Sequence, residues 1–306
     1  MTLCFNIAFF LAASRQKVTL NVYTVGKGKD IEYMKKGKSL IKCAVCSDTG
    51  NYRRNNEDNY YVAGKFKEDN TLDYDEYKVE YALTEDEATL ICAIFDGMGG
   101  LEAGEVASLL AAKTLSYYEN KSLQQCINEY FKRANDAIAK LEDRTGTTAT
   151  IIEFSLDGIT IGNIGDSRAY LYYPAEIKSK KSSRILQLTK DDTRAQYLID
   201  SGILEPEQAK GNGFINVLTQ HLGMPEDEMI INPEIKKRFR YKRRDIFLLC
   251  SDGISDVLSN EELRKLLDSS KRCSPINICR KIAEEAKAAG SKDNMTVLVA
   301  KVCSAK

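Results

Sequence analysis

The sequence predicts an α+β protein whose sheets are antiparallel. Predicted strands follow one another in blocks, and so do predicted helices, so the two kinds of element do not alternate as they would around a parallel sheet. The composition is that of a globular protein, with 43% hydrophobic and 29% charged residues in 306. A chain of this length can bury a large core, either in one large domain or in two small ones.

Apolar runs and helical periodicity place the elements in chain order. The predicted strands are residues 41–46, 59–63, 90–95, 147–154, 159–164, 169–173, 245–250 and 294–302. The predicted helices are residues 102–119, 123–141, 191–201, 260–267 and 276–289, with a short helical piece from Glu205. Residues 65–89 are polar and acidic, and we expect a hairpin excursion or a loop there.

Residues 1–39 are expected to be an N-terminal extension of unknown role, ahead of a domain at 40–303. The apolar stretch at 3–13 is too short to span a bilayer. It resembles the apolar part of a signal peptide, but no Lys or Arg precedes it. We therefore expect a strand there, and no membrane span.

Charge and cysteine content narrow the class of protein. Lys plus Arg and Asp plus Glu both number 44, so no net field favours nucleic acid or a membrane surface. Nine cysteines are scattered, some inside apolar runs, which is typical of buried thiols in a reducing compartment such as the cytoplasm. Cys43 and Cys46 lie three apart on a predicted strand and would point to opposite faces, so we interpret this pair as structural.

The most informative segment is residues 90–100, where six apolar residues run into Asp96 and a glycine-rich stretch follows. A carboxylate at the end of a buried strand is costly unless something pairs with it. A divalent cation is a suitable partner, because it neutralises the charge and binds oxygen ligands. Asp-Gly also marks ordinary turns, and this segment alone leaves that alternative open.

Acids recur at the ends of other predicted strands: Glu57 and Asp58 before residues 59–63, Asp252 after residues 245–250, and Asp293 before residues 294–302. A further acid, Asp166, lies between two strands in a Gly-Asp-Ser sequence that is also common in turns. Hard cations such as Mg²⁺ and Mn²⁺ bind carboxylates of this kind, and two ions can share a bridging one. Zinc is not expected, because the chain has no cluster of His and Cys.

Six motifs in order carry a family resemblance: R-x-x-N-E-D from Arg53, D-G-M-G-G from Asp96, T-T-A, G-D-S-R, S-D-G-I-S-D and K-D-N. The set resembles the metal-dependent PPM (PP2C-type) Ser/Thr protein phosphatases, the bacterial branch most of all, over residues 41–301. The resemblance implies a central β-sandwich of two antiparallel sheets flanked by helical pairs, a four-layer αββα arrangement with metals in a cleft at one end. Residues 189–223 resemble the flap of the bacterial enzymes, shortened at 211–213.

The resemblance also implies the metal ligands. Asp96 would bridge two Mn²⁺ or Mg²⁺ ions, and the carbonyl of Gly97 would bind one of them. Asp252 and Asp293 would hold the first ion, and Glu57 would hold the second.

A weaker third metal site is implied for Asp166 and Asp256, together with Asp252. Asp256 follows Asp252 by four residues, so one helical turn would place both on one side. The alternative for Asp166 is a turn-capping residue that pairs with Arg168.

In the catalytic roles, Asp58 would orient metal-bound water, and Arg53 would clamp the phosphoryl group through its bidentate guanidinium. Arg54 competes as a neighbouring surface charge, but the motif spacing favours Arg53. Some relatives carry a general-acid histidine where this chain has Met98, so the proton donor is left open. His221, the single histidine, is interpreted as structural or as part of the flap.

The implied activity is hydrolysis of phosphoserine and phosphothreonine in proteins by in-line attack of metal-activated hydroxide, without a phospho-enzyme. Phosphorylated proteins would be the substrates, those of a cognate Ser/Thr kinase among the candidates, and we expect a monomer. Two alternatives stay open. One is a non-catalytic regulator that binds phosphoproteins, whose usual mark would be lost metal carboxylates; the other is a phosphatase of small phosphoesters.

Overall fold

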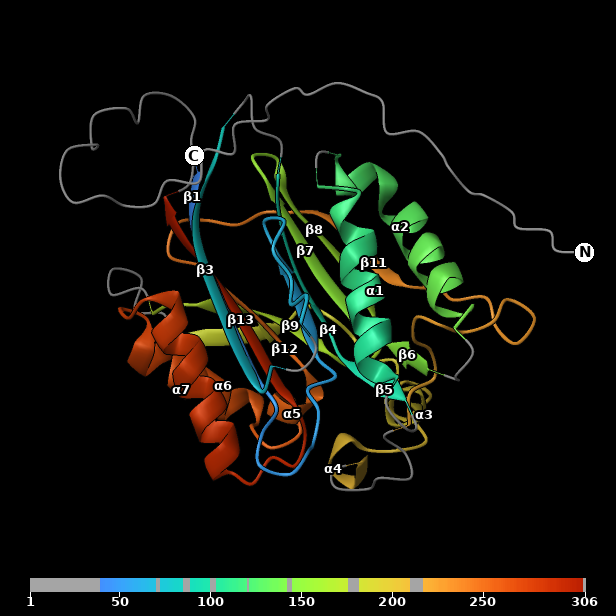
Figure 1. The fold of residues 1–306 in the computed structure, drawn as a ribbon. Helices are drawn as coiled ribbons and strands as arrows, with labels where there is room; N and C mark the ends of the chain where they lie inside the picture. Colours follow the sequence, from blue (N-terminus) through green and yellow to red (C-terminus); the bar gives the residue numbers. More distant parts are fainter. Residues whose placement is uncertain are drawn as a thin grey trace, which may run out of the picture.

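The computed structural model describes residues 39–69, 72–84, 89–99, 103–119, 121–141, 145–175, 182–209 and 217–304. Within these ranges the chain forms two antiparallel sheets packed face to face, with helices on both outer faces (Figure 1). The predicted fold class is therefore confirmed. Nearly all of the expected N-terminal extension, and the shortened stretch at 211–213, lie outside the described residues.

The larger sheet carries both predicted and unpredicted strands. In spatial order its strands are β10 (Arg184–Gln187), β9 (Arg168–Tyr173), β12 (Ile246–Cys250), β13 (Met295–Ser304), β1 (Ser39–Asp48) and β3 (Tyr74–Leu83). The smaller sheet consists of β11 (Glu234–Phe239), β8 (Gly158–Ile164), β7 (Ala149–Ser155), β4 (Leu90–Phe95) and β2 (Asn59–Val62). A two-stranded ribbon, β5 (Gly97–Gly99) with β6 (Thr145–Thr147), extends beyond β4.

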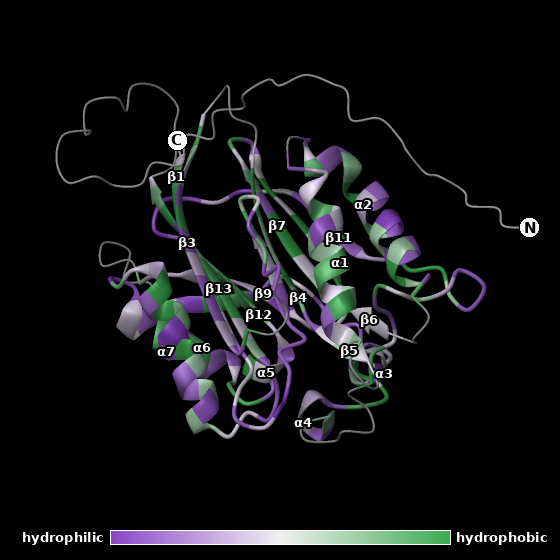
Figure 2. Cartoon of the chain, viewed as in Figure 1, coloured by the Kyte–Doolittle hydropathy of each residue, from purple (hydrophilic) through white to green (hydrophobic). Residues whose placement is uncertain are grey.

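Four long helices cover the sandwich. Helices α1 (Gly104–Ser116) and α2 (Leu123–Ile138) pack on the smaller sheet, and α6 (Asn260–Ser270) and α7 (Pro275–Ala288) pack on the larger one. Figure 2 shows hydrophobic residues along the sheets and hydrophilic residues on the outward faces of the helices. Three short helices, α3 (Arg194–Asp200), α4 (Pro206–Ala209) and α5 (Asp252–Ser255), lie near the end that holds β5. No helix in the described ranges combines the length and hydropathy needed to cross a bilayer.

Alternation along β1 shows how the two apolar layers are built. Cys43 and Val45 face the layer between the sheets, whereas Ala44 and Cys46 face the layer under α6 and α7. The expectation that Cys43 and Cys46 point to opposite faces is confirmed, and both are buried free thiols. By contrast, every residue of β4 is buried, because this strand has covered faces on both sides.

The acidic stretch at 65–89 is mainly a strand, not the loop that one alternative predicted. Strand β3 pairs with β1 from Leu83 opposite Ser39 to Tyr74 opposite Asp48. Its charged residues alternate along the strand, so one face is exposed and the other is half-buried. Charges on an edge strand discourage pairing with another chain. The same charges interrupt the apolar pattern, so a prediction from apolar runs does not find this strand.

Candidate metal centre

The fold brings the predicted ligands from separate segments to one end of the sandwich. In the smaller sheet, Asp96 directly follows β4, and Glu57 and Asp58 directly precede β2, which pairs with β4. In the larger sheet, Asp252 opens α5 just after β12, and Asp293 lies two residues before β13, which pairs with β12. Both sets lie at the end marked by β5 and α5 in Figure 1.

The electrostatics of these acids indicates that they lie close enough to influence one another. Burial raises the pKa of Asp96 well above its usual range, and the charges of Asp252, Asp58, Asp166 and Asp293 raise it further. The pKa of Asp252 is raised well above its usual range in the same way, by burial and then by the neighbouring carboxylates. These carboxylates therefore share one desolvated region in which each opposes the ionisation of the others.

The donor set fits a hard divalent cation. It consists of carboxylates with no sulfur or imidazole among them, which is the chemistry that Mg²⁺ and Mn²⁺ prefer. The mutual repulsion of these acids is what a bound cation would relieve. Within the described ranges, no three Asp, Glu, His or Cys side chains form a group already spaced to hold a metal ion.

Arg53 reaches this cluster. Its Nη2 atom donates a hydrogen bond to Oδ2 of Asp293 at 2.6 Å, while Oδ1 of Asp293 accepts from the backbone N–H of Asn294 at 2.8 Å. The Arg53 side chain is 51% exposed, so the guanidinium lies at the mouth of the cluster. Arg53 therefore contacts one of the predicted ligands, and its role as phosphoryl clamp stays a prediction.

Asp58 is fixed in the wall of the cluster. Its carboxylate is 1% exposed and accepts a hydrogen bond from Oγ of Ser251 at 2.8 Å. Burial raises the pKa of Asp58 to about 6, against the lowering effect of hydrogen bonds from Thr296 and Ser251 and of the Lys67 charge. A carboxylate held in this way has a defined direction, which suits the predicted orientation of a water molecule.

Gly97 is needed for space, and the alternative of an ordinary turn at the Asp-Gly pair is not what the structure holds. It belongs to the short strand β5. A Cβ atom on Gly97 would lie 2.2 Å from the carbonyl oxygen of Gly104 and 2.5 Å from that of Glu57. A Cβ on Gly104 would in turn lie 2.9 Å from the Glu57 carboxyl carbon. Paired glycines therefore let Glu57 approach the backbone that follows Asp96.

The third-site residues are also neighbours, although Asp256 is exposed. Burial raises the pKa of Asp166 to about 7, with further increases from Asp191 and Asp256. The short helix α5 provides the expected helical turn, since the N–H of Asp256 donates to the carbonyl of Asp252 at 2.8 Å. Arg168 forms a forked pair with Asp191 through Nε and Nη2, at 2.9 and 2.6 Å, so the alternative of an Asp166–Arg168 pair is not what the structure holds.

Two supporting residues were missed in the sequence. Asn294 accepts from the backbone N–H of Glu57 at 2.9 Å and donates to the carbonyls of Thr49 and Asn55 at 3.0 and 2.9 Å. Lys67 is 1% exposed and donates to the carbonyl of Asn56 at 2.8 Å. Asn294 lies in the K-D-N motif but was assigned no role, and Lys67 lies in the polar stretch at 65–89, where no site residue was predicted.

A double antiparallel sandwich between helical pairs, with buried acids at one end, is the architecture expected of the PPM class. The family model described as protein phosphatase 2C matches residues 59–194 and 211–295, and the chain belongs to this family. It is 30% identical over 273 residues to the serine/threonine protein phosphatase PstP of Mycobacterium tuberculosis, covering 86% of this chain and 45% of PstP. It is 28% identical over 276 residues to the protein phosphatase PhpP of Streptococcus pneumoniae, covering 84% of this chain and 96% of PhpP.

Solved structures agree with the sequence relatives. The catalytic domain of PstP in complex with two manganese ions superimposes with a TM-score of 0.65 at 30% identity, covering 86% of this chain and 99% of that one. A second crystal structure of PstP from M. tuberculosis gives a TM-score of 0.68 at 29% identity. The chain thus matches the catalytic domain of PstP and spans about half of the full-length protein.

The buried acids predict how the metal-free protein responds to pH. Because the folded-state pKa values of Asp58 and Asp166 are raised to about 6 and 7, the folded state binds more protons than the unfolded state above pH 4. Stability therefore falls as pH rises through this window. In EDTA, we expect the Tm to decrease from pH 5 to pH 7.5, by about 2–4 °C for each kcal/mol lost. Calorimetry would measure this decrease.

The control for this prediction uses single substitutions. Asp166→Asn should flatten the decrease, whereas Asp157→Asn, at an exposed acid in the β7–β8 turn, should leave it unchanged. A Tm that rises with pH in the metal-free wild type would contradict the interpretation that repulsion dominates the cluster.

The Asn294 side chain predicts a coupling between stability and metal affinity. Asn294→Ala leaves the Glu57 N–H and two carbonyls without their partner, so we expect a loss of about 2 kcal/mol or more in the free energy of unfolding. Because Glu57 loses its anchor, the affinity for Mn²⁺ measured by titration calorimetry should fall about 10-fold or more.

Asn135 is a matched control, since it is also buried and makes three hydrogen bonds, to Gly223 and Met224. Asn135→Ala should cost similar stability and leave the Mn²⁺ affinity near that of the wild type. Equal losses of affinity in both variants would mean that Asn294 acts only through stability.

Proposed function

We propose that the protein is a metal-dependent phosphatase that hydrolyses phosphoserine and phosphothreonine in proteins. The observation that carries this proposal is the convergence of Glu57, Asp58, Asp96, Asp252 and Asp293 on one half-buried region at an end of the sandwich. Membership in the protein phosphatase 2C family and the printed names of PstP and PhpP support it.

We propose Mn²⁺ or Mg²⁺ as the cofactor, in two main sites and a weaker third site at Asp166 and Asp256. Asp96 is the proposed bridging ligand, with the Gly97 carbonyl, Asp252, Asp293 and Glu57 completing the two main sites. When bound, the ions would lower the pKa of water and neutralise charge on the phosphoryl group. The PstP catalytic domain, whose structure contains two manganese ions, supports this number of sites.

The chain's own residues would then position the reactants. Arg53 can offer its planar guanidinium to two phosphoryl oxygens once it exchanges Asp293 for substrate, because a forked donor suits phosphate as well as carboxylate. Asp58, held by Ser251, would accept a hydrogen bond from the attacking water and fix its direction. The leaving oxygen still needs a proton, for which Met98 offers no donor.

Retention of every predicted metal carboxylate favours an active enzyme over a non-catalytic regulator. The substrates would be phosphorylated proteins, with the targets of a cognate Ser/Thr kinase as one set to examine. We further propose that the protein is cytoplasmic, since the cysteines in the described ranges are free and many are buried. We also propose that it is a monomer. A panel that compares phosphopeptides with nucleotides and sugar phosphates would separate the proposal from a phosphatase of small phosphoesters.

The proposal predicts loss of activity when a central carboxylate is neutralised. Asp96→Asn or Asp252→Asn removes charge that two cations need, so Mn²⁺-dependent hydrolysis of p-nitrophenyl phosphate should fall about 100-fold or more. Asp157→Asn, at the opposite end of β7, should retain wild-type turnover. Full activity in EDTA, or wild-type turnover in either site variant, would sink the proposal.

A further inference from the structure

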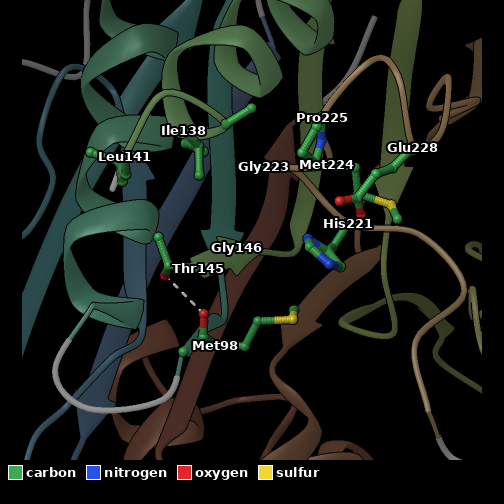
Figure 3. Close-up of a pocket in the computed structure, with 12 residues that line it drawn as sticks. Met98, Ile138, Leu141, Thr145, Gly146, His221, Gly223, Met224, Pro225 and Glu228 are labelled. Atoms are coloured by element: carbon green, nitrogen blue, oxygen red, sulfur yellow. Dashed lines mark hydrogen bonds between the residues drawn. The ribbon is translucent and has the colours of Figure 1, made fainter. Parts of the chain in front are cut away.

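A cavity of about 330 Å³ opens beside the candidate metal centre. Met98 and Gly99 of β5, Thr145 and Gly146 of β6, the end of α2 and the segment at 221–228 enclose it. Figure 3 shows the Met98 side chain facing the ring of His221, with Ile138 and Leu141 on another wall. Among the described residues, Met98, Ile138, Leu141 and Met224 give the cavity apolar walls, and Thr145, His221 and Glu228 add polar groups.

This cavity is held open by built-in contacts. Leu222 and Thr147 exchange backbone hydrogen bonds at 2.9 and 3.1 Å, which fixes the segment after the flap to β6. Asn135 of α2 accepts from the N–H groups of Gly223 and Met224 and donates to the carbonyl of Met224. Seven backbone N–H and C=O groups are satisfied in this way without closing the cavity. A pocket ordered before binding has less conformational entropy to lose when it is filled.

Gly146 explains how the histidine fits into this wall. A Cβ on Gly146 would lie 2.3 Å from Nδ1 of His221, so a side chain there would displace the ring. Nδ1 lies 2.9 Å from the carbonyl of Leu222, and since a carbonyl only accepts, Nδ1 must carry the proton in this hydrogen bond. His221 is thus part of a pocket wall, consistent with the expectation of a structural or flap residue.

Strand β5 connects the candidate metal centre to the wall of the pocket. Met98 follows Gly97 and is two residues from Asp96, a span of at most about 7 Å between Cα atoms. An extended peptide advances about 3.3 Å per residue. A side chain two or three positions from a phosphorylated residue could therefore reach the pocket while the phosphoryl group lies at the acids.

We propose that this pocket binds an aliphatic side chain of the phosphoprotein substrate, two or three positions from the phosphorylated residue. The proposal rests on the proposed function. Thioethers of Met98 and Met224 with Ile138 and Leu141 form an adaptable apolar surface, which suits leucine, isoleucine or methionine. Its volume of about 330 Å³ has room for such a side chain.

The experiment uses the full chain with Mn²⁺ and phosphothreonine peptides that carry Leu, Ala, Lys or Glu at each flanking position in turn. We expect one position two or three residues away to favour Leu over Ala by about 10-fold in kcat/KM. Met224→Glu places a second carboxylate in the wall and should shift the preference at that position from Leu toward Lys. A variant that is merely damaged would lose activity on all peptides alike, without this reversal.

Leu186→Glu is the matched control, because Leu186 is 47% exposed on β10 at the edge of the other sheet, and it should keep the leucine preference. Failure of the wild type to hydrolyse p-nitrophenyl phosphate would overturn the proposed function itself. Hydrolysis of p-nitrophenyl phosphate and all peptides with equal kcat/KM for Leu and Ala, or a leucine preference unchanged in Met224→Glu, would overturn only the pocket assignment.

Discussion

Mutual repulsion among buried carboxylates is the constraint on which this structure depends. Asp96 and Asp252 are held where burial opposes their ionisation, and each feels the charges of the other acids. Such a cluster opposes folding unless the surrounding structure fixes it and something positive relieves it. The two sheets fix the cluster, because the acids lie at the ends of paired strands and the apolar core holds these strands in register.

Residues around the cluster anchor the segments that carry the acids and offset part of their negative charge. Asn294 ties the segment before β2 to β13, and Lys67 holds the carbonyl of Asn56 from the protein interior. Burial lowers the pKa of Lys67 to about 8, while the charge of Asp58 acts in the opposite direction, so a cationic lysine is part of what offsets the acids. Arg53 adds a second positive charge at the mouth, where an incoming phosphoryl group would compete for it.

Much of this could be predicted from the sequence, because two strong local signals coincide at the site. The apolar run of β4 ends at Asp96, and the ordered motifs place the other acids at strand ends, where the structure has them. What could not be predicted depends on partners distant in sequence. Strand β3 is stabilised by pairing with β1 and so needs no apolar run, and the role of Lys67 follows from its burial against Asn56. The need for glycine at position 97 also could not be predicted, because it arises from close contacts with Gly104 and Glu57.

The short ribbon of β5 and β6 contributes both to the candidate metal centre and to the proposed substrate pocket. Its first residue, Gly97, packs against Glu57 at the metal centre, and its second, Met98, lines the pocket shared with His221. Thr147 of β6 binds both the carbonyl of Asp96 through its hydroxyl and Leu222 through its backbone. A shift of this ribbon would therefore move Asp96 and the pocket together. Met98, which lacks the acid function of the histidine found in some relatives, is placed where an apolar side chain contributes a wall instead.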